Sequence, residues 1–405
     1  MRSTICLLLL IILLSGCKKE TDSEPDYSCN CQPYGKNVLS LIFSQTTALY
    51  PYENEKHRWG FIDESGSAVI GAVYADAWSF SNNRAMIVDD KNGVQFAGFI
   101  DPTGSIAITP RFRLISESLF SSEGLAPIGD SKINLFGYIN LAGEVIIPFQ
   151  FRLGLSFHDG MAVILSGDRL GAIDVTGRMA IPCQYESMSM FSEGLALAFV
   201  SGVKPGYINH ENLYKIQGDF TDGSIFLNGL AAVKDFSTRL IGFIDTSGQF
   251  VIPPKFSDAY VFSEGLAAME FLGKWGFINK YGNFVIQPQY EDVCVGFCNG
   301  LAPVKKNSQW GYIDQTGKFV ISPQFFDADL FYCNLAKVWF IDGTAGYINK
   351  TGKVVYHSTQ SFKGESNFPK IANALEKFNI RIGKGSSVHS SLIKLTDESS
   401  AIPIQ

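Results

Sequence analysis

The feature that most constrains this chain is an eight-residue segment that returns nine times. Its clearest copy is Trp275–Gly282, which has the pattern of a strand running into a tight turn. The first glycines of the nine copies are 34 to 39 residues apart, and they are Gly60, Gly98, Gly137, Gly171, Gly206, Gly242, Gly276, Gly311 and Gly346. A fixed period in this range indicates a repeat architecture.

Each copy has isoleucine two residues after its first glycine, Asp or Asn three after, and Gly six after in all copies but one. Asp or Asn opening a four-residue turn that Gly closes is typical of a type I turn, and we expect positive φ at the closing residue. In the fifth copy Asn212 replaces this Gly. Because Asn tolerates positive φ better than most residues, the turn is expected there too.

A second strand follows each turn, and it is rich in β-branched residues and commonly closed by Pro. An aromatic residue stands 14 positions after the first glycine in eight copies: Tyr74, Phe112, Phe151, Tyr185, Phe220, Phe256, Tyr290 and Phe325. A third strand begins near Gly-Leu-Ala, as in Phe262–Met269. Asn83 and Asn334 replace the glycine of that motif, and we expect positive φ at both.

These motifs resemble the WG-repeat family of bacteria, named for the Trp-Gly pair. The resemblance covers residues 59 to about 352, although only Trp59, Trp275 and Trp310 keep the Trp. It implies a β-rich repeat array and says almost nothing of activity, because such repeats are attached to many kinds of protein.

The repeats predict an all-β fold of about 35 residues per repeat, with three short antiparallel strands each. A propeller blade has four strands, so the strand count favours an open, solenoid-like superhelix. In that form the isoleucines and the aromatic residues would form two buried ladders. The alternative is a closed β-propeller in which the half repeat Ala345–Tyr356 and the segment 37–58 complete one shared blade.

The N-terminus has the pattern of an export signal. Arg2 precedes the apolar run Ile5–Leu14, which is too short to span a bilayer. The sequence Leu14-Ser15-Gly16-Cys17 resembles the lipobox of bacterial lipoproteins. The resemblance implies cleavage before Cys17 and acylation of that cysteine. The alternative is an ordinary secretory signal with an incidental cysteine.

The rest of the chain divides into three parts. Residues 17–36 are polar and predict a disordered tether, after a signal peptide at 1–16. The repeat array occupies 37–356, and its first residues, 37–58, are expected to pair as strands. Residues 357–405 predict a partly ordered tail with one helix near 367–378. The acidic residues after Lys19 loosely resemble a surface-export signal of some bacterial lipoproteins, and a solvated linker explains them equally well.

The cysteines permit a disulfide, because an exported chain meets an oxidising compartment. Cys298 and Cys333 lie 13 residues before the first glycines of adjacent repeats, so stacking would bring them close together. This pair is the candidate disulfide, and buried small apolar residues are the alternative. No histidine lies near enough in sequence to complete a zinc site with them.

Other motifs for chemistry have structural explanations. The Asp and Asn column invites a calcium site, but each member also stands where a turn needs such a side chain. Gly311–Lys318 has five residues between its glycines where a phosphate loop needs four. Glu123, Glu193 and Glu264 recur before Gly-Leu-Ala, and this repetition favours a role in turns. We therefore predict no metal, no cofactor and no catalytic residue.

Two classes of function fit these observations. The first is a cell-envelope lipoprotein that binds an unidentified protein or glycan through its repeat surface and is anchored to the membrane, most readily the outer membrane. The second is an enzyme acting on envelope glycans, with its site in the degenerate stretch His210–Asn228. The formal charge of −6 and the absence of a basic stripe argue against nucleic-acid binding.

Overall fold

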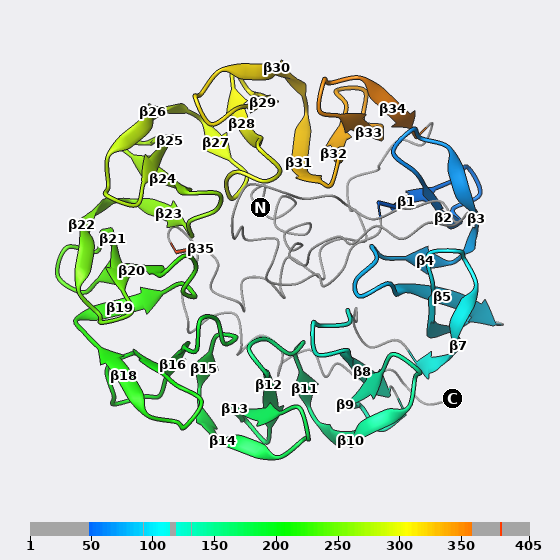
Figure 1. Cartoon of the computed structure of the whole chain (residues 1–405), viewed down its shortest axis with the longest axis horizontal. Helices are drawn as coiled ribbons and strands as arrows, with labels where there is room; N and C mark the ends of the chain where they lie inside the picture. Colours follow the sequence, from blue (N-terminus) through cyan, green and yellow to red (C-terminus); the bar gives the residue numbers. More distant parts are fainter. Residues whose placement is uncertain (1–47, 92, 114–118, 131, 359–380, 383–405) are drawn as a thin grey trace, which may run out of the picture.

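The fold is a ring of nine small antiparallel sheets, as the computed structural model shows (Figure 1). The structure describes residues 48–91, 93–113, 119–130, 132–358 and 381–382. Cys17, the tether and the helix expected near 367–378 lie outside these residues. Each sheet is one blade of a β-propeller, and we number the blades 1 to 9 along the chain.

Six of the described blades carry four strands, whose order from the axis outward follows the chain, and four of these six come before blade 7. Blades 2, 4, 5 and 6 are β4 (Asp76–Ala77), β5 (Ala85–Lys91), β6 (Val94–Ile100), β7 (Ile106–Arg113); β11 (Leu153–Gly154), β12 (Met161–Ser166), β13 (Arg169–Asp174), β14 (Met179–Tyr185); β15 (Ser187–Met188), β16 (Ala196–Phe199), β17 (Gly206–Ile208), β18 (Tyr214–Gln217); and β19 (Phe220–Gly223), β20 (Leu230–Asp235), β21 (Ile241–Asp245), β22 (Phe250–Phe256).

The last three blades follow the same order, and blade 7 gains a fifth strand, β35. They are β23 (Asp258–Tyr260), β24 (Leu266–Phe271), β25 (Lys274–Asn279), β26 (Phe284–Tyr290) with β35 (Arg381–Ile382); β27 (Asp292–Val293), β28 (Ala302–Lys306), β29 (Gln309–Ile313), β30 (Phe319–Phe325); and β31 (Asp327–Tyr332), β32 (Leu335–Trp339), β33 (Ala345–Asn349), β34 (Val354–His357).

Blades 1 and 3 show three strands within the described residues. They are β1 (Tyr50–Glu53), β2 (Trp59–Ile62), β3 (Ala68–Tyr74), and β8 (Leu125–Asp130), β9 (Leu135–Asn140), β10 (Val145–Phe151). The residues just before β1 and before β8 include undescribed ones, so an innermost strand is not assigned there.

The ring has two ends that differ in their loops. One end, the turn face, carries the Asp/Asn-x-x-Gly turns and the turns before Gly-Leu-Ala. The opposite end, the hairpin face, carries the hairpins between the second and third strands of four-stranded blades and their equivalents in blades 1 and 3. This separation follows from the antiparallel pairing, because a strand that starts at one end must finish at the other.

The first glycine of each repeat is needed for space. A Cβ on Gly276 would lie 2.6 Å from the main-chain oxygen of Ile286 and 2.7 Å from the nitrogen of Pro288. The register between β25 and β26 shifts at this point, so that the outer strand bulges over the glycine. The same clash with the outer strand recurs at all nine first glycines.

The last glycine of each repeat joins neighbouring blades. A Cβ on Gly282 would lie 3.0 Å from Cγ2 of Ile252, which belongs to the outer strand of the preceding blade. At Gly66 in blade 1, the added Cβ would meet the main-chain oxygen of Val355, in the outer strand of blade 9. The contact that joins consecutive blades therefore also joins the last blade to the first.

The open superhelix is therefore wrong, and the closed propeller is the fold. The Tyr347 hydroxyl donates to the carbonyl of Pro51 over 2.8 Å, and the Tyr356 hydroxyl donates to that of Glu53 over 2.8 Å. One buried apolar cluster contains Tyr50 and Tyr347 together. The two ends do not share a blade, because β1 pairs with β2 and β34 pairs with β33.

The predicted ladders form the core between blades. All nine isoleucines are buried, from Ile62 to Ile348. The aromatic residues are buried too, except that Tyr74 is only half-buried. The third strand of the repeat also exists, but it belongs to the next blade, where it follows a short inner strand. Each sequence repeat therefore begins in one blade and ends in the next.

The expected positive φ is found at Asn212 and Asn83, with φ of 61° and 54°. The expectation for Asn334 is wrong. In the turn between β31 and β32, Cys333 takes the left-handed conformation, with φ of 51°. Positive φ at the first central residue alone is the pattern of a type II′ turn, so the second residue needs no left-handed conformation.

Candidate functional site

The recurring acids of the Ser-Glu-Gly turns bind the backbone of the next blade. Glu264 accepts hydrogen bonds from the amides of Asn299 and Gly300, at 2.7 and 3.0 Å. Glu193 does the same for Asn228 and Gly229, at 3.0 and 2.8 Å. These carboxylates satisfy amides at positive-φ turns and tie consecutive blades together. Their repetition is therefore structural, as the sequence indicated.

Glu123 joins blade 3 to blade 4 in the same way. Its Oε1 accepts a hydrogen bond from the amide of Gly160 over 3.0 Å. Burial raises the pKa of Glu123, but hydrogen bonds led by the Gly160 amide outweigh it, and the net pKa is lowered. The carboxylate is thus held in its charged form, which suits a hydrogen-bond acceptor and does not suit a general acid.

The recurring Asp and Asn residues accept hydrogen bonds within their own turns. Asp314 Oδ1 accepts hydrogen bonds from the Thr316 amide at 2.9 Å, the Thr316 hydroxyl at 2.6 Å and the Lys318 amide at 3.1 Å. The same arrangement recurs around Asp63, Asp101, Asp174 and Asp245. Over the described part of the chain, no group of three or more His, Cys, Asp or Glu is placed to hold a metal ion.

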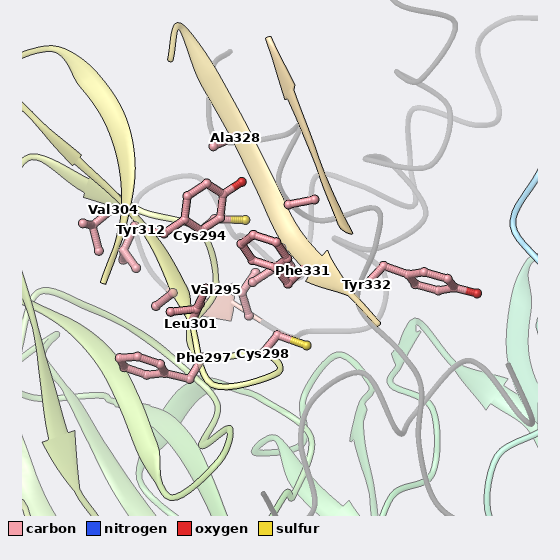
Figure 2. Close-up of a cluster of buried hydrophobic side chains, with 14 of the residues drawn as sticks. Cys294, Val295, Phe297, Cys298, Leu301, Val304, Tyr312, Ala328, Phe331 and Tyr332 are labelled. Atoms are coloured by element: carbon pink, nitrogen blue, oxygen red, sulfur yellow. The ribbon is translucent and has the colours of Figure 1, made fainter. Parts of the chain in front are cut away.

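The candidate disulfide between Cys298 and Cys333 is not formed. Cys298 carries a thiol, whereas Cys333 is disulfide-bonded. Figure 2 shows Cys298 and Cys294 among buried apolar side chains, including Phe297 and Phe331. Since Cys183, Cys294 and Cys298 carry thiols, Cys333 is bonded to a cysteine outside the described residues. The equal sequence offset places Cys298 and Cys333 in adjacent blades without bonding them to each other.

The polar residues of the degenerate fifth repeat lie in two neighbouring blades. His210 lies in the turn after β17, where its ring packs edge-on against Phe191 at a centroid distance of 4.7 Å. Asp222 lies in the inner strand β19 of the next blade, and its carboxylate accepts a hydrogen bond from the Gly223 amide over 2.8 Å. Asn212 is bound by the hydroxyl of Tyr185 over 2.7 Å.

A pair of buried charged residues departs from the repeat pattern in blade 9. Asp329 and Lys337 occupy positions that hold Ser224 and Ala232 in blade 6, where the serine hydroxyl accepts a hydrogen bond from the alanine amide over 3.0 Å. Both charged residues are buried. The sequence does not indicate this pair, because the pairing of β31 with β32, which brings the two residues together, cannot be read from the repeat pattern.

Aromatic rings and other acids surround this pair. The ammonium of Lys337 lies 5.4 Å from the ring centre of Trp339 and 6.0 Å from that of Trp59, across the seam between blades 9 and 1. Burial lowers the pKa of Lys337, while Asp329, Glu53 and Asp76 oppose that shift. Burial, with Asp327 nearby, raises the pKa of Asp329 well above its usual range.

A small pocket opens beside Lys337 at the seam. Its lining includes Tyr52, Trp59, Tyr347 and Tyr356, and its volume is ≈ 20 Å³. That is enough for about one water molecule, whereas pockets for small ligands measure about 300–1,000 Å³. The charged pair and the pocket therefore fit the closure of the ring better than the binding of a substrate.

The described residues thus define a closed β-propeller whose recurring polar groups are bound within its own turns. The chain belongs to the family of the WG containing repeat, whose model matches more than half of its length. The matched residues are 59–92, 98–128, 136–169, 171–202, 241–275, 275–310 and 310–338. The match omits the segment 203–240, which contains the degenerate fifth repeat.

Other comparisons are weaker. A search of curated proteins finds no match. Among solved structures, the computationally designed Ika8 protein is 12% identical, with a TM-score of 0.38, over 68% of this chain and 93% of that chain. BamB from Moraxella catarrhalis is 11% identical, with a TM-score of 0.37, over 62% of this chain and 84% of that chain.

A third similar structure is Hsv2 from Kluyveromyces lactis, at 10% identity and a TM-score of 0.35, over 56% of this chain and 90% of that chain. Similarities at this level carry no argument about function. The described residues contain no helix with the length and apolar character needed to cross a membrane.

Proposed function

We propose that the chain is a cell-envelope lipoprotein that acts as a non-enzymatic binding or scaffold module. One observation carries the proposal: the polar groups that recur in the propeller are engaged in its turns and blade contacts, as Glu264 and Asp314 illustrate. What the fold offers to other molecules is its extended surface, which is how repeat proteins commonly bind partners.

Membrane attachment rests on the sequence. The apolar run Ile5–Leu14 followed by Ser15-Gly16-Cys17 supports acylation at Cys17. Each buried methylene contributes about 0.8 kcal/mol, and two or more acyl chains would anchor the protein stably. We place the propeller in the envelope, at the outer membrane, with a protein or glycan as its partner.

The anchor is tested by Cys17→Ala. We expect the wild type to sediment with membranes and to carry acyl mass on its N-terminal cysteine. The variant should be unprocessed or should leave the membrane fraction. A wild type without acyl mass, together with unchanged fractionation of the variant, would refute lipidation.

The binding role is tested by affinity capture from envelope extract, using the full chain as bait. A partner that is retained by the wild type and can be reconstituted from purified components supports the proposal. Turnover of an envelope glycan by the purified chain would contradict its non-enzymatic part.

A further inference from the structure

Cys333 lies in the turn between β31 and β32, on the turn face of blade 9, which is next to blade 1 in Figure 1. Its two neighbours in sequence both contact the first residue of β1. The Tyr50 hydroxyl donates to the Tyr332 carbonyl over 3.1 Å and accepts from the Asn334 amide over 3.2 Å. The Asn334 side chain also donates to Glu64 Oε1 over 2.7 Å. The turn that contains Cys333 is thus held against blade 1, at the seam of the ring.

The disulfide partner of Cys333 is narrowed by elimination. Cys333 is disulfide-bonded, and the other cysteines of the described residues carry thiols. The remaining cysteines of the chain all precede β1, and they are Cys6, Cys17, Cys29 and Cys31. A bond to any of them joins blade 9 to the segment that leads into blade 1.

The proposed function removes two of these four cysteines. Cleavage of the signal before Cys17 takes Cys6 from the mature chain, and acylation of the Cys17 sulfur leaves that residue without a thiol. Cys31 precedes Ala48, where the described chain begins, by 17 residues. Such a length spans at most roughly 60 Å, and Ala48 leads into β1 beside the turn of blade 9. Both Cys29 and Cys31 are therefore within reach of that turn.

We propose that Cys333 forms its disulfide with Cys29 or Cys31 and that this bond is a covalent latch across the seam. The choice of these two cysteines rests on the proposed function, because it needs cleavage before Cys17 and acylation of its sulfur. The latch ties blade 9 to the segment before β1. Because a disulfide restricts the states in which its two ends are apart, the latch disfavours opening of the ring at the seam.

Formation of the latch needs an oxidant, which an exporting cell supplies. Two thiols lose two protons and two electrons as their sulfur atoms join. A protein disulfide of the oxidising compartment takes up the electrons and becomes a dithiol. The second cysteine of Cys29-Asn30-Cys31 keeps its thiol. When its thiolate attacks the Cys333 sulfur, the bond moves from one cysteine to the other without net oxidation.

Non-reducing peptide mapping of the full-length, exported protein tests the pairing. Free thiols are alkylated in denaturant before digestion with trypsin. Cys29 and Cys31 share the tryptic peptide 20–36, and Cys333 lies in the peptide 319–337. We expect these two peptides to be linked, with one alkylated cysteine in 20–36. Cys333 that is alkylated, or that is linked to any other peptide or to 319–337 of a second copy, would overturn the inference.

Reduction with a phosphine tests the action of the latch. Amide hydrogen exchange in β1, β2, β33 and β34 should accelerate at least about tenfold, since a disulfide typically contributes more than the equivalent of this factor. Exchange in β17 and β20, on either side of the junction between blades 5 and 6, should not change. Exchange at the seam that does not respond to reduction would overturn the latch.

A double variant, Cys29→Ser with Cys31→Ser, leaves every residue of the blades unchanged. It should show the fast exchange at the seam without reductant, and reductant should add nothing. Cys183→Ser is the matched control, because Cys183 is a half-buried thiol in blade 4. It should keep the linked peptides and the exchange of the wild type. A double variant with the exchange of the wild type would contradict the latch.

The mass of the intact protein separates this inference from the proposed function. Linked peptides from a chain without acyl mass would leave the pairing in place and fail the anchor. Acylated protein in which Cys333 is a thiol would fail the inference alone.

Discussion

At the scale of single residues, two glycines of the repeat are needed for different reasons. Gly276 has an ordinary φ, and the bulged outer strand leaves no space for a Cβ there. Gly282 has φ of +78°, and the turn itself selects the residue. In the fifth repeat, Asn212 takes the place of this turn glycine and has φ of 61°. The position of Gly276 is glycine in all nine repeats, because a Cβ on any other residue would clash with the backbone of the outer strand.

This difference predicts the effect of replacing Gly282. Gly282→Val should lower the free energy of unfolding by about 2 kcal/mol, because a β-branched residue is strained at positive φ. Gly282→Asn should cost less than about half as much, as Asn212 indicates. Chemical denaturation followed by circular dichroism measures both.

Gly71 is the control for these substitutions. It lies in β3 without positive φ, and a Cβ on it would meet nothing within 4 Å. Gly71→Val should therefore leave stability unchanged or raise it, since Val is favoured in strands. Equal losses for Gly282→Val and Gly71→Val would contradict the assignment of the turn.

At the scale of the strand, the turns and hairpins could be predicted from sequence and the inner strands could not. Asp292–Val293 is a complete inner strand of two residues, too short for any alternation of apolar and polar residues to be recognised. Its position is set by pairing with β28, a contact between residues 11 to 13 positions apart. A count of three strands per repeat therefore leaves out the inner strand, and without that strand the four-stranded propeller blade cannot be recognised.

The inner strands also carry acids that titrate in an unusual range. Burial raises the pKa of Asp222 to about 7 from its ordinary value of 3.8, while the Gly223 amide and Lys234 act in the opposite direction. The folded protein then holds this proton up to about pH 7, whereas the unfolded chain releases it near 3.8. The contribution to stability is full below pH 3.8 and is lost as pH rises towards 7.

We therefore expect Asp222→Asn to become more stable relative to wild type as pH rises from 4 to 8. The amide keeps an acceptor for the Gly223 hydrogen bond and has no charge to bury. The gain should be at most on the order of 4 kcal/mol at pH 8. Thermal or urea unfolding across this pH range measures it.

Asp245→Asn should show the opposite dependence of stability on pH. Hydrogen bonds led by that of the Ser247 hydroxyl lower the pKa of Asp245. Its contribution to stability is therefore present above the unfolded pKa and is lost as pH falls through the folded pKa. This variant should lose stability relative to wild type at neutral pH and match it in acid. The same pH trend in both variants would rule out the assigned pKa shifts.

At the scale of the whole molecule, closure depends on quantities that no single repeat reveals. The sequence shows that Gly66 and Gly352 are equivalent, but not that the outer strand of blade 9 reaches Gly66. That contact is set by the rotation between successive blades, accumulated around the ring. For the same reason Asp329 and Lys337 could not be recognised in advance as neighbours at the seam.

The seam is the one junction between consecutive blades that the chain does not cross. Elsewhere a short link joins the blades, such as the one between β18 and β19. At the seam, blades 9 and 1 are joined by side chains, among them Tyr347 and Tyr356. Opening of the ring should therefore begin there, because no main-chain link joins the outer strand of blade 9 to β1.

Tyr347→Phe tests this. It removes the hydroxyl that donates to the Pro51 carbonyl over 2.8 Å and leaves that acceptor without this donor, at a cost of about 1 kcal/mol. Amide hydrogen exchange in β1, β2, β33 and β34 should accelerate about fivefold, as a cost of this size implies.

Tyr207→Phe is the matched control, because Tyr207 occupies the same position in blade 5 and donates to the Ser224 carbonyl over 2.7 Å. Its cost in stability should be similar, but exchange in blades 1 and 9 should not change, since the chain itself holds blades 5 and 6 together. If both variants accelerated exchange equally at the seam, the ring would open as a whole, and closure would be no weaker between its ends than between any other two blades.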